Sequence, residues 1–327
     1  MGSKTTRREF LKQAALTGAA ITGLPAIAGA AEGVLGASGK SRVVLATDGA
    51  VLRSDTEIVQ SVLDKMLGRS VAKLMNASTG AEAWKKLFSP GDVIGIKVNC
   101  LCGKGVATHP EMVTAVVSGL RMAGVREENI IIWDRSSRDL MKCGYKINKD
   151  KPGVKCYGDD DDWGETITRG AFKGRITKFI SEKCNGFVNV PILKSHGITG
   201  ISCCLKNHYG SFDNPGSHHD NHCNPAMADF NSLPVVRKKT RLVVVDAIRP
   251  QYEGGPDLKP EMQWNYYSLL VSTDPLAADY QGLKIIERKR NELNMQPFGD
   301  KVTAWLEAAR ERGVGTCDPN RIELVTV

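Results

Sequence analysis

The sequence lacks the cysteine and glycine motifs by which many redox proteins and enzymes are identified. No two of its nine cysteines have the Cys-x-x-Cys spacing, and no Cys-x2-Cys-x2-Cys run occurs. These absences argue against a zinc ribbon, a thioredoxin-like motif and a ferredoxin-type cluster. The chain also lacks Gly-x-Ser-x-Gly, and no Gly-x-Gly-x-x-Gly follows an early strand. A hydrolase with a nucleophile elbow and a dinucleotide-binding protein of the usual kind are therefore not expected.

Long apolar runs and stacking aromatic residues are scarce too. The apolar run from Ala14 to Ile27 is shorter and weaker than the ~20 residues of a membrane span, so no stable span is expected in the mature protein. Only 6% of residues are aromatic, and none alternate with the basic clusters Arg237–Lys239 and Glu287–Arg290. Because nucleic-acid grooves interleave basic and aromatic side chains, no nucleic acid partner is expected.

The N-terminal residues follow the order of an export signal. Arg7-Arg8 precedes an uncharged run from Ala14, and Ala28-Gly29-Ala30 offers small residues for cleavage. The order resembles a bacterial twin-arginine signal, which predicts that residues 1–30 are a signal peptide and that the twin-arginine translocation machinery is a partner. The protein is then periplasmic or otherwise exported, already folded, which favours a cofactor inserted before export. A basic amphipathic helix is the alternative, and the signal could also stay uncleaved as an anchor.

Nine cysteines in the mature chain are an odd number. In an oxidising compartment at least one thiol is then left unpaired, bound to a metal or reactive.

Apolar runs alternate with helical patterns after residue 30, which predicts an α/β fold for a single domain, residues 31–327. We expect a largely parallel sheet flanked by helices in Rossmann-like layers, with an irregular insertion at residues 136–185. Within this insertion, the four aspartates of Asp159–Asp162 are expected to form a solvated turn. The expected strands are Ser41–Ala46, Val93–Val98, Ile130–Trp133, Gly186–Leu193, Thr240–Ala247 and Ser268–Thr273.

The segment from Lys194 to Gly210 follows one of these strands and has the composition of an anion site. Ligands of open α/β sheets bind at the carboxyl ends of the strands. If residues 200–208 are helical, their free N–H groups together with Lys194 and Lys206 could hold a carboxylate or phosphate. The competing interpretation is structural: the two lysines could pair with buried aspartates such as Asp229, Asp246 or Asp274.

Five of the six histidines lie between Lys194 and Cys223, and three of them are in the segment Ser217–Cys223. Imidazole and thiolate bind borderline and soft transition metals, so this density predicts a metal or cofactor site. An exposed loop that binds metal only adventitiously is the alternative.

A series of short motifs spans most of residues 90–290, namely Gly91–Asn99, Thr108–Glu111, Lys194–His196, Leu205–Gly210, Cys223–Pro225, Ala228-Asp229, Asp246-Ala247, Gly254–Pro256 and Ser272–Pro275. In order and spacing these motifs resemble the domain-of-unknown-function 362 family. The name of that family leaves its activity open.

A looser similarity links the same segment to the N-terminal domain of lactate racemase, which carries a nickel-pincer nucleotide. The nearest matches are Lys194, His196, Gly200 and Lys206, whereas Ser202 and Cys203 replace the paired glycines of that motif.

These patterns predict three groups of site residues. Lys97, Lys194 and Lys206 are expected to be catalytic, orienting an anionic substrate or stabilising developing negative charge. Asn99, Gly200, Asn207 and Asp274 are expected to contact a cofactor. A transition metal is the best guess for that cofactor, and its expected ligands are His196, His208, His219, His222 and Cys223.

The function expected from these residues is that of an exported metal- or cofactor-dependent enzyme, redox or isomerising, acting on an anionic small molecule. The alternatives are a non-catalytic periplasmic binding protein for a metal ion or anionic ligand, and a purely structural role for the histidine cluster. Turnover and bound metal would distinguish the three.

Overall fold

A computed structural model describes residues 39–327, which belong to one compact unit. The predicted signal peptide, residues 1–30, lies outside the described residues. Among residues 39–327 no helix has both the length and the apolar character needed to span a membrane.

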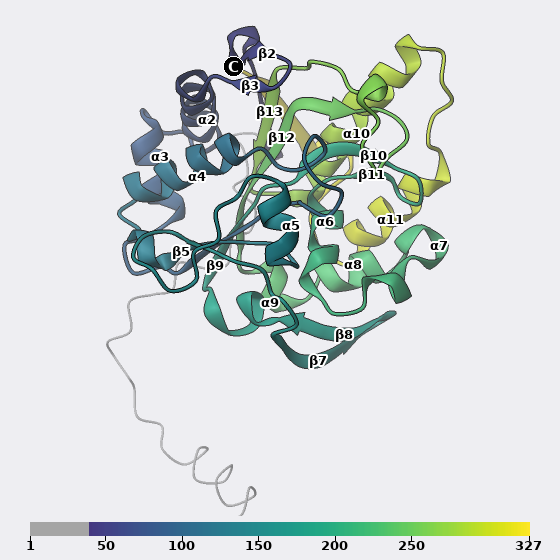
Figure 1. The fold of residues 1–327 in the computed structure, drawn as a ribbon. Helices are drawn as coiled ribbons and strands as arrows, with labels where there is room; N and C mark the ends of the chain where they lie inside the picture. Colours follow the sequence, from purple (N-terminus) through teal and green to yellow (C-terminus); the bar gives the residue numbers. More distant parts are fainter. Residues whose placement is uncertain (1–38) are drawn as a thin grey trace, which may run out of the picture. The chain divides into compact units, whose positions relative to one another are not determined.

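The unit is built on a ten-stranded sheet whose main path runs β14-β1-β13-β12-β9-β4-β5-β6, with β10 and β11 attached to β12 (Figure 1). Most neighbours pair in parallel, whereas β13 is antiparallel to both β1 and β12. The predicted α/β class with a largely parallel sheet is confirmed. The strands of this sheet are β1 Ser41–Thr47, β4 Ile94–Lys97, β5 Ile130–Trp133, β6 Lys155–Cys156, β9 Gly186–Asn189, β10 Ile192–His196, β11 Gly200–Ser202, β12 Thr240–Gln251, β13 Ser268–Ser272 and β14 Ile322–Thr326.

Helices cover both faces of the sheet, and this explains why its central strands are apolar on both sides. Along β1, Val43 and Val44 are both fully buried but belong to two different core clusters, because successive strand residues point to opposite faces. The helices α2 Gln60–Leu74, α3 Gly80–Leu87 and α4 Pro110–Met122 contribute to one core; α6 Cys204–Asn207, α8 Ala226–Asn231, α9 Pro234–Arg237, α10 Pro275–Glu292 and α11 Asp300–Glu311 contribute to the other.

The predicted strand Gly186–Leu193 is in fact two strands. β9 stops at Asn189, and after Pro191 the chain continues as β10, which pairs further along the long strand β12. Pro191 has no N–H to give to a neighbouring strand, so the ladder is interrupted there. The break moves Lys194 and His196 beyond the end of β9, to the edge where β4 and β5 also end.

The segment 136–185 contains more regular structure than its sequence indicated. It holds α5 Ser137–Lys142 and an antiparallel hairpin of β7 Trp163–Arg169 and β8 Phe172–Thr177. A second small hairpin, β2 Leu52–Ser54 with β3 Glu57–Ile58, lies near the start of the domain. The predicted solvated turn is wrong for Asp159, which is buried with its pKa raised to about 6 by that burial, whereas the other three aspartates are exposed.

Close packing between α3 and α4 depends on a glycine, and this gives a test of the fold. A methyl group at Gly119 in α4 would lie 2.1 Å from Cε2 of the fully buried Trp84. Gly119→Ala is therefore expected to lower the free energy of unfolding by ~1–3 kcal/mol, although alanine is the better helix former. The measurement is urea unfolding.

Gly68→Ala is the matched control, because Gly68 also lies inside a helix, α2, and nothing would be within 4 Å of its added methyl group. It is expected to be neutral or to stabilise by up to ~1 kcal/mol. Equal midpoints for the two variants would contradict this packing.

Candidate functional site

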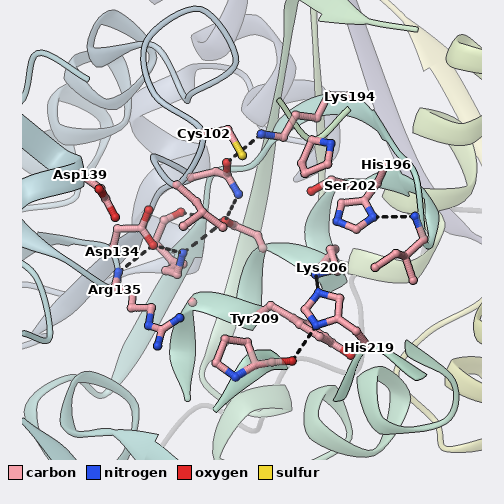
Figure 2. Close-up of a pocket in the computed structure, with 18 of the residues that line it drawn as sticks. Cys102, Asp134, Arg135, Asp139, Lys194, His196, Ser202, Lys206, Tyr209 and His219 are labelled. Carbon is pink, nitrogen blue, oxygen red and sulfur yellow. Dashed lines mark hydrogen bonds and ion pairs between the residues drawn. The ribbon is translucent and has the colours of Figure 1, made fainter. Parts of the chain in front are cut away.

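A cavity of about 280 Å³ opens at the carboxyl ends of β4, β5 and β10. It contains all three lysines predicted to be catalytic, and Figure 2 shows several of its side chains pointing toward a common space. Of the other predicted residues it includes Asn99, Asn207, His196 and His219. The remaining lining residues are Leu101, Cys102, Asp134, Arg135, Asp139, Gly197, Ile198, Ser202, Tyr209, Gly210, Pro215 and Pro256.

Lys97 is held in a buried ion pair. Its Nζ lies 2.7 Å from Oδ1 of Asp134, and the two side chains are 1% and 7% exposed. It also donates to the Val98 carbonyl at 2.6 Å and to Oδ1 of Asn207 at 3.3 Å. Every proton of this ammonium group therefore has an acceptor, so Lys97 organises the wall of the cavity.

Lys194 and Lys206 differ from Lys97 in having no carboxylate partner. Among residues 39–327, neither forms an ion pair. Lys194 donates to Oδ1 of Asn99 at 3.3 Å and to the Val106 carbonyl at 3.0 Å. Lys206 lies 3.2 Å from Nε2 of His219 and 3.7 Å from the centre of the Tyr209 ring.

Burial without a counter-charge destabilises the ammonium form of both lysines. It lowers the pKa of Lys194, and it lowers the pKa of Lys206 to about 8. Four cationic side chains line the cavity, Lys97, Arg135, Lys194 and Lys206, against the two carboxylates Asp134 and Asp139. The cavity is thus suited to a ligand that brings negative charge.

The structural alternative for these lysines is wrong, because the buried aspartates have other partners. Asp229 pairs with Arg312 and accepts the Ala171 N–H. Asp246 pairs with His109 at 2.7 Å. Asp274 caps α10 by accepting the N–H groups of Leu276 and Ala277, and it also accepts from Ser41. Asp274 is consequently a helix cap outside the cavity, where it contacts no ligand bound there.

The helix N-terminus expected within residues 200–208 is not an open anion site. Gly200–Ser202 is strand β11, and the helix begins only at Cys204. The carboxylate of Asp279 accepts the N–H groups of Cys204 at 2.5 Å and Leu205 at 3.0 Å. The protein itself therefore provides the anion at this position, and the lysine side chains are what remain for a ligand.

Two histidines stand in the cavity wall with their rings nearly parallel, His196 and His219, 6.3 Å apart between centres. Burial, followed by the charge of Lys206, lowers the pKa of both, in the case of His196 to about 3. Both rings are therefore neutral at pH 7.

Their hydrogen bonds assign the tautomers. Nδ1 of His196 accepts the N–H groups of Ile198 at 3.2 Å and Thr199 at 3.3 Å, so its proton is on Nε2. Nδ1 of His219 faces the Pro215 carbonyl at 2.8 Å and must donate, which leaves an electron pair on Nε2 for Lys206. His196 is thus a donor, and His219 an acceptor from Lys206.

The structure does not bring the five predicted metal ligands together. His208 is buried against Phe230 with Nδ1 3.1 Å from Oγ of Ser211, and Cys223 lies in the core. His222 is half-buried, and its Nδ1 donates to the Ile198 carbonyl at 2.9 Å. A positive φ at Asn221, His222 and Cys223, within α7 Asp220–Cys223, turns successive side chains in different directions.

Within residues 39–327, the one group of three metal-ligand side chains whose ligand atoms lie within 4.8 Å of one another is Cys203, Cys204 and Asp279. A single centre built from the five predicted ligands is therefore not formed in this structure. Gly200 is also absent from the cavity: it has a φ of +74°, and a methyl group there would meet Val302 at 2.2 Å. Its role is close packing.

Several lining residues are absent from the predicted site. Asp134 and Arg135 directly follow β5, and their position after a predicted strand was the signal that could have included them. Tyr209 lies in the motif Leu205–Gly210, and its place three residues after Lys206 in that motif was the sequence signal. Its contact with Lys206 depends on the turn that follows α6.

The fold and the cavity define an α/β protein with a cationic pocket at the carboxyl edge of its sheet. Residues 94–284 match the family described as domain of unknown function (DUF362), and the chain belongs to this family. The matched segment contains every residue that lines the cavity.

The chain is also similar to a protein of Thermotoga maritima with a crystal structure, at 12% identity and a TM-score of 0.37. The similarity covers 80% of this chain and 60% of that one, so the chain spans less than two thirds of that protein's length. A comparison with curated proteins finds no match.

Lys97 has a carboxylate partner and Lys206 has none, so replacing each by methionine is expected to change the free energy of unfolding differently. Lys97→Met leaves the buried Asp134 carboxylate without its cation and is expected to cost ~3–5 kcal/mol. Lys206→Met removes a buried charge that has no carboxylate partner, so its free energy of unfolding is expected to be unchanged or higher. Urea unfolding of both variants measures this. A large loss of stability in Lys206→Met would mean that its contacts with Tyr209 and His219 are structural.

Proposed function

We propose that this chain is an enzyme that binds a small anionic molecule in the cavity and isomerises it by proton transfer. The observation that carries the proposal is the pair of buried ammonium groups, Lys194 and Lys206, which have no carboxylate partner in the described chain. Keeping two such charges is costly, and the cost is offset when an anion binds between donors already in place.

Lys206 and its neighbour His219 supply the acid and base, and Lys194 and its neighbour His196 supply hydrogen-bond donors. Lys194 and the Nε2 proton of His196 are donors for an oxyanion. Lys206, with a pKa of about 8, exists in both protonation states near neutral pH, and Nε2 of His219 accepts its proton in a hydrogen bond of 3.2 Å. We assign Lys206 and His219 to the proton transfer, and Lys194 and His196 to the negative charge that develops on the substrate.

Of the two reaction types that the sequence leaves open, this site favours isomerisation over redox chemistry, since an acid–base pair lines the cavity. A transition metal at this position could bind Nε2 of His219 only by displacing the Lys206 ammonium group. Elemental analysis of the protein purified from its native compartment tests for that metal.

Solvent exchange tests the reaction. The full chain is incubated in D2O with a panel of small carboxylates, and deuterium at the carbon next to the carboxylate is followed by NMR. We expect exchange with at least one of them and its loss in Lys206→Met. Titration calorimetry with phosphate and the same carboxylates runs in parallel.

The outcomes separate enzyme from binding protein. Binding without exchange would mean a non-catalytic binding protein, and no binding of any anion would overturn the proposal. Lys284→Met is the control, because Lys284 is an exposed lysine on α10 outside the cavity and its replacement should leave both exchange and binding unchanged.

We further propose that the protein is exported by the twin-arginine route, with residues 1–30 as its signal. The support is the sequence order of Arg7-Arg8, the run from Ala14 and the small residues at Ala28 to Ala30. Replacing Arg7 and Arg8 by lysine should retain the protein in the cytoplasm, as measured by cell fractionation. Unchanged export of that variant would contradict the assignment.

A further inference from the structure

The cavity has apolar side chains as well as cationic ones. Leu101 is 66% exposed and Ile198 is 38% exposed, so they are two of the eight large apolar residues that are exposed within the described chain. Both line the cavity, together with Pro215 and Pro256. A single exposed leucine needs no explanation, but two exposed apolar side chains in one cavity with buried lysines suggest a ligand with an apolar part.

These apolar residues come from separate loops that the structure holds in place. Ile198 lies in the turn between β10 and β11, where its N–H donates to His196 and its carbonyl accepts from His222. His222, predicted as a metal ligand, thus positions this turn.

The position of Pro256 is fixed by the hydrogen bonds of the preceding residue, Gly255. The Gly255 N–H donates to Oγ of Ser195 at 3.0 Å, and its carbonyl accepts from Gly197 at 3.0 Å. This contact is so close that a methyl group at Gly255 would lie 1.9 Å from the Ser195 carbonyl oxygen. The loop that contains Pro256 therefore packs directly against β10.

Leu101 lies in the loop after β4, next to the anchored Cys100. The Cys100 N–H donates to Oδ2 of Asp134 at 2.7 Å, and its carbonyl accepts from the Cys143 thiol at 3.4 Å. The carboxylate that pairs with Lys97 thus also fixes the backbone beside Leu101. The apolar surface and the cationic surface belong to one preorganised site.

We propose that the ligand of this cavity is an amphipathic carboxylate: an anionic group bound by Lys194 and Lys206, with an apolar body against Leu101, Ile198 and Pro256. This inference rests on the proposed function and adds the class of substrate. The cavity volume of about 280 Å³ is just below the ~300–1,000 Å³ that is usual for ligand sites. The apolar body is therefore a short aliphatic chain or a single ring.

The test compares carboxylates that differ only in their apolar part, namely acetate, butyrate, hexanoate and phenylacetate, by calorimetric titration of the full chain. Each buried methylene should tighten binding by about fourfold, since ~0.8 kcal/mol per methylene is gained on burial. The ratio of hexanoate to acetate affinity should fall in Leu101→Ser and in Ile198→Ser. Both residues are exposed, so their replacement does not threaten folding.

Leu324→Ser is the control, because Leu324 is 46% exposed on β14 and does not line the cavity. Its affinity ratio should match that of the unaltered chain. Equal affinity for all four carboxylates, or a ratio unchanged in both loop variants, would overturn the amphipathic ligand while leaving anion binding intact. Binding of neither phosphate nor any carboxylate would contradict the proposed function itself.

The exposed apolar residues could instead contact a second copy of the chain, and sedimentation velocity tests this. A dimer of the unaltered chain in sedimentation velocity that dissociates in Leu101→Ser would assign the apolar residues to a second copy, and it would overturn the proposal.

Discussion

The buried ion pair between Lys97 and Asp134 is the contact on which the rest of the site depends. Lys97 ends β4, and Asp134 follows β5 directly, so the pair joins two neighbouring strands at their carboxyl ends. The second oxygen of Asp134 fixes the Cys100 N–H, and Asn207 bridges the Lys97 carbonyl to Asn189 at the end of β9. Removing either charge would leave the other buried and unpaired. Loss of the Lys97 ammonium group would also remove a contact with Asn207 of α6, and loss of the Asp134 carboxylate would remove the contact with the loop after β4.

Around this neutralised pair lie two further lysines that form no ion pair with any residue from 39 to 327. Lys194 and Lys206 are as buried as many core residues, yet their partners are carbonyls, amides, an imidazole and an aromatic ring. Such an arrangement is unfavourable for folding alone, and a bound anion would offset its cost. The buried aspartates Asp229, Asp246 and Asp274 do not neutralise these lysines, because each of them forms a helix cap or another ion pair.

Sequence patterns predicted most strands of the sheet, but they predicted fewer of the residues that line the cavity. The strands β1, β4, β5, β12 and β13 were predictable because their apolar runs are buried on both faces. The split at Pro191 and the hairpin of β7 and β8 were missed, since both depend on which strands are available for pairing. All three predicted catalytic lysines line the cavity, whereas only His196 and His219 of the five predicted metal ligands do so.

The sequence by itself determined the α/β class, the family, the strand-end position of Lys194 and His196, and the density of histidines after them. Residue type and spacing carry that information, because the periodicity of apolar residues can be read within a short stretch of sequence. Only the tertiary structure decided which of those side chains share a cavity. A left-handed turn at residues 221–223 separates neighbouring histidines. Contacts between residues over 100 positions apart give Asp246 and Asp274 partners other than Lys194 and Lys206. Charge compensation is a property of the folded chain, because the partners of Asp229, Asp246 and Asp274 come from segments distant in the sequence.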